Sequence, residues 1–205
     1  MSAGGARTRS SLLILDTGGL LDYDPAWNVR SIPLGQGLNP KARALAAFGG
    51  NLYVLDTGAN QLWRYRPQGD GYEAADKYFD VPPGDLSNVV DVAVDGNVYL
   101  LYSDGHIRKF FAGKEIGFAI TGVTQIKPVA LTVDTTVRQS MIYIADMGGM
   151  RIIQLSTDGT LIRQIRATND ALSALEDVLV DEATGRLFVI SGSKLYVGRL
   201  PALTP

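Results

Sequence analysis

Side chains that could act as nucleophiles or general bases are scarce in this sequence. It contains no cysteine and one histidine, His106. Thiolate chemistry, disulfide bonds and cysteine zinc sites all require cysteine, and a Ser–His–Asp triad requires histidine at the reacting centre. His106 directly follows the turn phrase Asp104-Gly105, so we interpret it as a solvated turn residue. The sequence therefore gives little support to catalysis by histidine or cysteine.

Carboxylates are the remaining candidates for metal or acid–base chemistry, and several recur at fixed places. Asp16, Asp56 and Asp146 each end an apolar run and stand two residues before a glycine. Such oxygens could bind a hard cation such as Ca²⁺. The Asp-x-Gly phrase also has a structural role, because the carboxylate accepts backbone amides of a tight turn. We favour the turn-capping interpretation for these three residues.

A second pair of carboxylates shares a position within a repeating pattern. Asp91 lies four residues before Asp95, and Asp177 lies four residues before Asp181. Each begins a short apolar, β-branched run. Whether these side chains can meet depends on the elements that carry them.

Those elements repeat along the chain. One six-residue pattern recurs five times, and the last residues of successive copies are 40, 46, 44 and 45 positions apart. A bulky residue fills the third place of every copy, which predicts one packing position used five times. The copies read SLLILD at 11–16, NLYVLD at 51–56, NVYLLY at 97–102, MIYIAD at 141–146 and RLFVIS at 186–191.

Three further strands are expected around each copy, because β-rich runs alternate with turn phrases. A strand rich in small residues precedes the copy and a middle strand follows it. A polar outer strand then comes last, predicted at 27–32, 75–79, 117–120 and 161–165. Four antiparallel strands in about 40–46 residues are typical of a β-propeller blade. Small residues suit the innermost strand, where blades crowd an axis.

Several phrases resemble NHL repeats. They are LYVLDTGAN at 52–60, DVAVDGNVY at 91–99 and IYIAD at 142–146. The resemblance covers roughly residues 41–199, with a weaker copy at 11–38. It implies a six-bladed propeller of the gluconolactonase-like or TolB-like type.

The predicted fold is therefore all-β, a propeller of four-stranded antiparallel blades with about five blades visible. The first repeat lacks its inner strand and the last lacks its outer strand, so we expect a fragment of a larger propeller. A tight five-bladed ring is the alternative. We place a disordered or linker segment at 1–10, the propeller at 11–200 and a tail at 201–205. The blades fall at about 11–38, 41–81, 87–122, 127–167 and 175–200.

The binding site is expected where chains enter the inner strands, because these ends form the mouth of the axial channel. Mixed charges there suit a small polar ligand. In the lactonase-like group that the sequence resembles, Glu, Asn and Asp from different blades hold one divalent ion. Asp91, Asn88 and Asp177 could imitate that set, although ordinary strand-end charges are the simpler interpretation. The candidate ligand-binding residues are Arg43, Asn88, Asp91, Lys127 and Asp177, with Asp91 and Asp177 as weak metal candidates.

The composition limits the classes of partner that the protein is expected to bind. A net charge of −2 and 46% hydrophobic residues describe an ordinary globular chain without a basic nucleic-acid surface. The apolar run at 12–15 is too short for a signal-peptide core or a bilayer span, so direct membrane insertion is not expected. The expected partner is a protein, a peptide or a small polar ligand. Self-association through incomplete end blades is a further expectation.

We therefore predict a non-catalytic binding module that needs no cofactor, serving as a sensor or scaffold domain of a larger protein. A metal-dependent lactonase or hydrolase with a divalent cation is the alternative function. The compartment stays open between the cytoplasm and an extracytoplasmic part of an anchored protein.

Overall fold

The structure is a computed structural model of the 205-residue chain. It describes residues 12–16, 19–24, 28–32, 42–69, 71–81, 83–135 and 139–202. The predicted linker at 1–10 lies outside the described residues, and so do the last three residues of the predicted tail. Within the described residues, no helix combines the length and the apolar character needed to cross a bilayer.

The chain divides into two compact units, which are treated separately below. One comprises residues 1–87 and 112–114, and the other comprises residues 88–111 and 115–205. In both, hydrogen-bonded strands are antiparallel and follow one another in chain order. The all-β fold with blade-like sheets is therefore confirmed.

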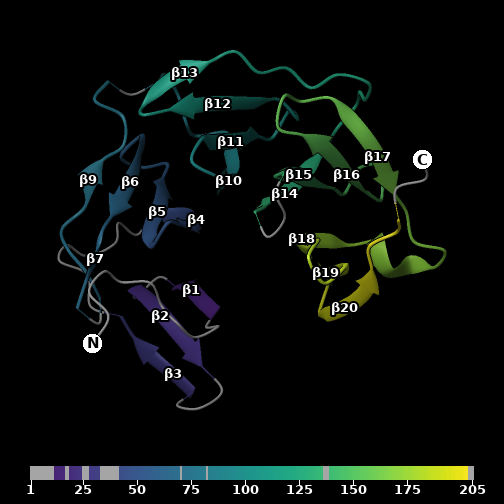
Figure 1. The fold of residues 1–205 in the computed structure, drawn as a ribbon, viewed down its shortest axis with the longest axis horizontal. Helices are drawn as coiled ribbons and strands as arrows, with labels where there is room; N and C mark the ends of the chain where they lie inside the picture. Colours follow the sequence, from purple (N-terminus) through teal and green to yellow (C-terminus); the bar gives the residue numbers. More distant parts are fainter. Residues whose placement is uncertain are drawn as a thin grey trace. The chain divides into compact units, whose positions relative to one another are not determined.

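The first unit holds two successive blades (Figure 1). The first blade has three strands: β1 (Leu12–Asp16), β2 (Gly19–Asp24) and β3 (Asn28–Ser31). The second has four: β4 (Ala42–Phe48), β5 (Asn51–Asp56), β6 (Gln61–Tyr65) and β9 (Asp76–Lys77). Between β6 and β9 lies a small hairpin of β7 (Pro67–Gln68) and β8 (Gly71–Tyr72).

The second unit holds three blades. The first contains β10 (Val89–Val94), β11 (Val98–Tyr102), β12 (Ile107–Phe111) and β13 (Lys114–Ile116). The next contains β14 (Pro128–Asp134), β15 (Met141–Asp146), β16 (Arg151–Ser156) and β17 (Leu161–Ile165). The last contains three described strands, β18 (Leu175–Asp181), β19 (Arg186–Ser191) and β20 (Lys194–Arg199). One turn of 3-10 helix, η1 (Asp170–Leu172), precedes β18.

The six-residue pattern forms the second strand of every complete blade, and its alternation builds the core. Side chains of successive strand residues point to opposite faces. In β15, Ile142 and Ile144 therefore join the cluster shared with the β10–β13 blade. Tyr143 and Ala145 join the cluster shared with the β18–β20 blade. Each core thus lies between two neighbouring blades.

The bulky third residue of the pattern is buried in three of the five copies. Tyr53, Tyr99 and Tyr143 are buried, whereas Leu13 and Phe188 are half-buried. The Tyr143 hydroxyl donates a hydrogen bond to Glu182 of the next blade, and burial raises the pKa of Tyr143. Tyr143 therefore ties its blade to the next one, whereas the Tyr99 hydroxyl donates to Asp95 of its own blade.

One outer strand was predicted in the wrong place. The expected strand at 117–120 is extended chain without strand pairing, and β13 instead follows β12 after a two-residue turn. That turn places Ala112 and Gly113 at φ of 48° and 78°. Two positive φ values suit the tight turns that match strand twist. Ala-Gly is a weaker turn signal than Asn-Gly or Asp-Gly, which explains the error.

Phe111 also departs from expectation. Because neighbouring blades cover both faces of an internal blade, the sequence favours burial of both rings of Phe110-Phe111. Phe110 is buried, whereas Phe111 is 60% exposed at the end of β12. Three further aromatic residues lie in or against the cores between blades: Trp63, Tyr65 and Tyr196.

Candidate functional site

The four inner strands share one irregularity at the end where the chain enters them. The pairing of β4, β10, β14 and β18 with the following strand breaks by one residue near the strand start. Such β-bulges bend a strand and re-aim side chains, and they are frequent beside binding sites. The extra residues are Arg43, Val90, Val129 and Glu176. The bulge therefore defines a common end of the blades.

All five predicted site residues lie at this end of their strands. Arg43 is the extra residue of the first bulge and is exposed. Asn88 and Lys127 directly precede β10 and β14, and both are exposed. Asp91 and Asp177 are the first residues after their bulges. The predicted equivalence of Asp91 and Asp177 thus holds in the strand register. Arg43 belongs to the first unit and the other four to the second.

Asp91 binds the neighbouring blade. One carboxylate oxygen accepts the backbone N–H of Val92 at 2.8 Å. The other accepts the backbone N–H of Leu131 in the next inner strand at 2.7 Å. Charge-assisted hydrogen bonds of this kind are strong. Asp91 therefore joins the inner strands β10 and β14.

Among the hydrogen bonds of the described residues, Asp177 accepts only the amide of the residue that follows it and none from another blade. Its Oδ1 accepts the backbone N–H of Val178 at 2.7 Å. Partial desolvation raises the pKa of Asp177, and the hydrogen bond from Val178 opposes that rise. No group of three or more His, Cys, Asp or Glu side chains suited to a metal ion occurs in the described ranges.

The turn aspartates cap their turns, as we favoured from the sequence. Asp56 accepts the backbone amides of Gly58 and Ala59 at 3.0 and 2.9 Å. Asp146 accepts the amide of Gly149 at 3.2 Å. The Asp16 side chain lies outside the described atoms. His106 is exposed, stacks on Tyr102 and contacts Asp104, which fits the turn-residue interpretation.

Asp146 also organises the entry to β14. It is fully buried, and its Oδ1 accepts the backbone amide of Lys127 at 2.9 Å. Its Oδ2 accepts Nε–H of Arg151 at 2.6 Å. This ion pair is well shielded, because the Arg151 side chain is only 11% exposed. One carboxylate therefore fixes the incoming chain, its own turn and an arginine.

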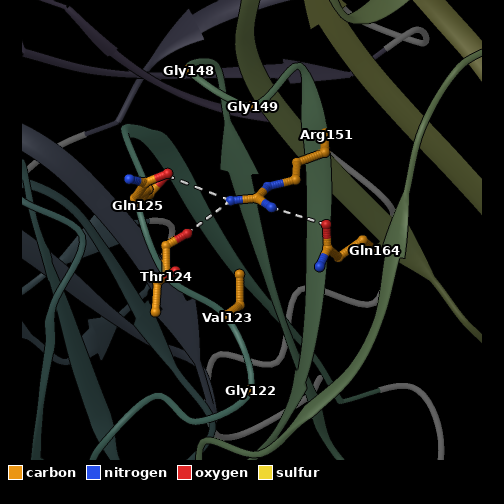
Figure 2. Close-up of a pocket in the computed structure, with 8 residues that line it drawn as sticks. All are labelled: Gly122, Val123, Thr124, Gln125, Gly148, Gly149, Arg151 and Gln164. Atoms are coloured by element: carbon orange, nitrogen blue, oxygen red, sulfur yellow. Dashed lines mark hydrogen bonds between the residues drawn. The ribbon is translucent and has the colours of Figure 1, made fainter.

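Arg151 spans the wall of a cavity of about 480 Å³ (Figure 2). Its Nη1 donates to Oε1 of Gln164 at 2.9 Å. Its Nη2 donates to the backbone carbonyl oxygens of Thr124 at 3.2 Å and Gln125 at 3.5 Å. The guanidinium is thus occupied by protein acceptors and acts as a brace. The cavity is lined by Gly122, Val123, Thr124, Gln125, Gly148, Gly149, Arg151 and Gln164.

Two of the three glycines in the lining, Gly148 and Gly149, allow this close packing. A Cβ on Gly148 would lie 2.7 Å from Cβ of Lys127. A Cβ on Gly149 would lie 2.6 Å from Nε of Arg151 and 2.7 Å from Oδ2 of Asp146. Real Cβ atoms do not approach so closely, so any side chain here would displace the brace.

The residues singled out from the sequence lie at the same end of the blades as this cavity, but the sequence did not indicate the cavity itself. The sequence pointed to Lys127, which flanks the cavity, and not to Arg151, Gln164 or the segment 122–125. One signal was present: Asp146 and Arg151 are direct partners across the β15–β16 hairpin. Opposite charges facing each other across a hairpin indicate an ion pair. The contact with 124–125 joins residues far apart in sequence and leaves no local signal.

Comparison with known proteins supports the fold alone. No protein-family profile matches the chain, and no curated protein matches it by sequence. Solved structures do match. A gluconolactonase from Xanthomonas campestris aligns with a TM-score of 0.65 and 18% identity, over 93% of this chain and 69% of that one. A chain of a nidogen/laminin complex aligns with a TM-score of 0.64 and 17% identity, over 94% and 78%.

A third match is the extracellular domain of a putative one-component system from B. thetaiotaomicron. Its TM-score is 0.57 at 14% identity, over 95% of this chain and 28% of that one. These likenesses and the five consecutive sheets of three or four strands give the chain a β-propeller fold with five blades. Proteins with very different functions share such folds, so the function must be argued from the site.

Proposed function

We propose that this chain is a non-catalytic propeller module that binds a protein, a peptide or a small polar ligand at the blade ends where the inner strands begin. The cavity beside Arg151 carries the proposal. Its volume of about 480 Å³ lies in the range of ligand pockets. Binding sites are also commonly placed on loops that a rigid scaffold supports.

The cavity walls suit recognition by hydrogen bonding. Asp146 and Arg151 hold the turn after β15 and the segment at 124–125 in place. A site that is already ordered lowers the entropic cost of binding a ligand. Thr124, Gln125 and Gln164 contribute hydroxyl and amide groups. Groups of this kind match the amide and hydroxyl groups of a peptide segment or a small neutral ligand. Exposed Lys127 next to the cavity adds a positive charge.

We further propose that the module serves as a sensor or scaffold domain of a larger protein. Support comes from the solved structures of similar fold, which include an extracellular domain of a putative signalling system and a chain of a protein–protein complex. The alignment covers 28% of that extracellular domain, so a fold of this kind can form one part of a longer chain.

The decisive experiment compares two tryptophan variants of the purified protein. Thr124 lines the cavity and bonds Arg151 through its backbone, so Thr124→Trp should obstruct the cavity and keep the brace. Thr135→Trp, at an exposed residue after β14, is the matched control. Ligands are first found by thermal-shift screening of amino acids, dipeptides and neutral sugars.

The proposal expects at least one ligand whose dissociation constant rises tenfold or more in Thr124→Trp and stays unchanged in Thr135→Trp. Equal affinity of the ligand for the native protein and both variants would show that the ligand binds outside this cavity. A screen without a single shift, followed by no partner in a lysate, would argue against a binding module.

A metal-dependent lactonase has less support from the geometry. Both oxygens of Asp91 accept backbone amides, which competes with coordination of a cation. Titration of the same protein with Ca²⁺, Zn²⁺ and Mn²⁺ tests this alternative directly. A thermal shift that Asp177→Asn abolishes would favour the lactonase over the binding module.

A further inference from the structure

The last blade presents an unpaired strand edge. β18, β19 and β20 form a three-stranded sheet, and within the described ranges no strand pairs with the outer side of β20 (Figure 1). The Leu200 N–H bonds to the Gly185 carbonyl at 2.9 Å, which sets the phase of the ladder. Alternate residues of an antiparallel strand turn their backbone groups to opposite sides. Leu195, Val197 and Arg199 therefore turn theirs toward the open edge.

A cavity of about 300 Å³ adjoins this edge. Its floor is apolar, formed by buried Leu172, Leu187 and Val189 together with half-buried Tyr196. The charged residues in its lining are Arg166 and Arg199, both exposed. An apolar floor with a basic rim lies beside free backbone donors and acceptors.

The preceding blade, β14–β17, has a fourth strand and shows which side chain fills the corresponding space. There β17 pairs with β16, and Leu161 lies opposite Leu155 and packs against the core. The counterpart of Leu155 in the last blade is Gly198, because Ile142–Leu155 and Leu187–Gly198 are equivalent cross-strand pairs. The cavity beside Gly198 therefore corresponds to the space that an apolar side chain of a fourth strand fills.

The charged residues around β20 indicate which kind of strand could pair with its open edge. β20 carries Lys194 near its start and Arg199 at its end, and Arg166 lies on the cavity rim. Antiparallel pairing of β20 with β20 of a second copy would bring these like charges together, and charged edges discourage such pairing. Acidic residues at both ends of an added strand would instead meet opposite charges. Exposed Leu195 and Val197 favour apolar residues in its centre.

We propose that β20 and the adjoining cavity form a docking site for an extended peptide segment with an apolar centre and acidic ends, which adds to the blade as a fourth strand. Backbone hydrogen bonds to Leu195, Val197 and Arg199 supply affinity, and the cavity beside Gly198 selects an apolar side chain. This site is separate from the Arg151 cavity and does not depend on the function proposed for it.

The test uses a synthetic eight-residue probe in which four central valine and leucine residues are flanked by two glutamates on each side. Two related peptides are the controls: one has a central proline, and one has lysine in place of glutamate. Fluorescence anisotropy measures binding to the full chain. Amide exchange then asks whether Leu195, Val197 and Arg199 become protected.

Two leucine variants give a matched comparison. A Cβ on Gly198 meets no atom within 4 Å, so Gly198→Leu fills the cavity without a clash. Gly117 is equally open and lies outside this blade, so Gly117→Leu is the control. We expect Gly198→Leu to weaken the acidic probe at least tenfold and Gly117→Leu to leave it unchanged. Equal thermal midpoints of the two variants would confirm that both fold.

A charge exchange completes the test. Arg199→Glu should weaken the glutamate probe at least fivefold and strengthen the lysine probe. Binding of the proline peptide as tightly as the parent probe would overturn strand addition. So would a failure of all three peptides to bind. Concentration-dependent dimers that Gly198→Leu abolishes would assign the edge to a second copy and overturn the peptide proposal.

Discussion

Asp91 and Asp177 are the same residue type at the same place in two blades, yet they have different surroundings. Asp91 reaches the amide of Leu131 in the following inner strand, and Leu131 is only 5% exposed. Asp177 has its local bond to Val178. The two residues therefore allow a direct comparison: Asp91 contacts the next blade, and Asp177 makes only a local hydrogen bond.

Replacing each aspartate by alanine should separate these two roles. Asp91→Ala leaves the buried Leu131 amide without its acceptor, which costs about 1–3 kcal/mol of unfolding free energy. Asp177→Ala should change the unfolding free energy by no more than about 0.5 kcal/mol, as exposed substitutions usually do. Urea denaturation measures both. Equal losses would show that the bond between blades contributes nothing beyond the local one.

Residue-level prediction from the sequence succeeded where the cause was local. The capping role of Asp56 and Asp146 follows from an Asp-x-Gly phrase that spans three residues. The bond between Asp91 and Leu131 joins residues 40 positions apart, and the brace of Arg151 reaches back to Thr124. No local signal predicts such contacts, because they depend on how one blade packs against the next.

At the scale of elements, β13 is held to β12 by an exposed charge pair. Arg108 donates from Nε to Oε1 of Glu115 at 2.9 Å and from Nη2 to Oε2 at 2.5 Å. The hydrogen bond from Arg108 lowers the pKa of Glu115 from its ordinary value of 4.5. A carboxylate with a lowered folded-state pKa stabilises the fold above its unfolded pKa and loses that effect as pH falls through the folded pKa.

The stability difference between the native protein and Glu115→Gln should therefore shrink on acidification. We expect a difference below about 1 kcal/mol near neutral pH, since both partners are partly exposed. It should begin to fall below pH 4.5 and vanish at lower pH. Thermal midpoints across that range measure it, with Glu176→Gln as an exposed control. A difference that grows on acidification would contradict the assigned role of Arg108.

Strand existence was easier to predict than strand position. The six-residue pattern identified the second strand of all five repeats, because burial on both faces demands a continuous apolar run. The outer strand of the third blade was misplaced, since its position depends on positive φ at Ala112 and Gly113. Outer strands are short and polar, so hydrophobic periodicity does not specify their register.

At the scale of the whole molecule, repetition was the strongest sequence signal and also limited what the sequence revealed. Regular spacing predicted blades and their order, and within the described residues the first and last sheets have three strands each. The features on which the proposed functions rest are departures from the repeat. Arg151 has no counterpart opposite Asp56, where Gln61 stands. Gly198 replaces the leucine of the previous blade. Such departures become informative only when the register is known.

Nearest-neighbour packing of the blades makes a prediction about how the molecule opens. Repeat proteins owe stability to each repeat and to its interfaces with adjacent ones. Ile152 is fully buried in the cluster between the last two blades, so Ile152→Ala should cost about 2–5 kcal/mol. Ile162, which is 38% exposed on the adjoining β17, provides the matched control, and Ile162→Ala should cost far less.

Amide hydrogen exchange then shows which strands become less stable in Ile152→Ala. Exchange in Ile152→Ala should accelerate most in β14–β20, whose side chains build that cluster, and least in β1–β3 of the other unit. This gradient follows because a cavity weakens the interface that contains it first. Uniform acceleration along the chain would instead mean that all five blades open in one cooperative step, and the nearest-neighbour description would then be wrong for this protein.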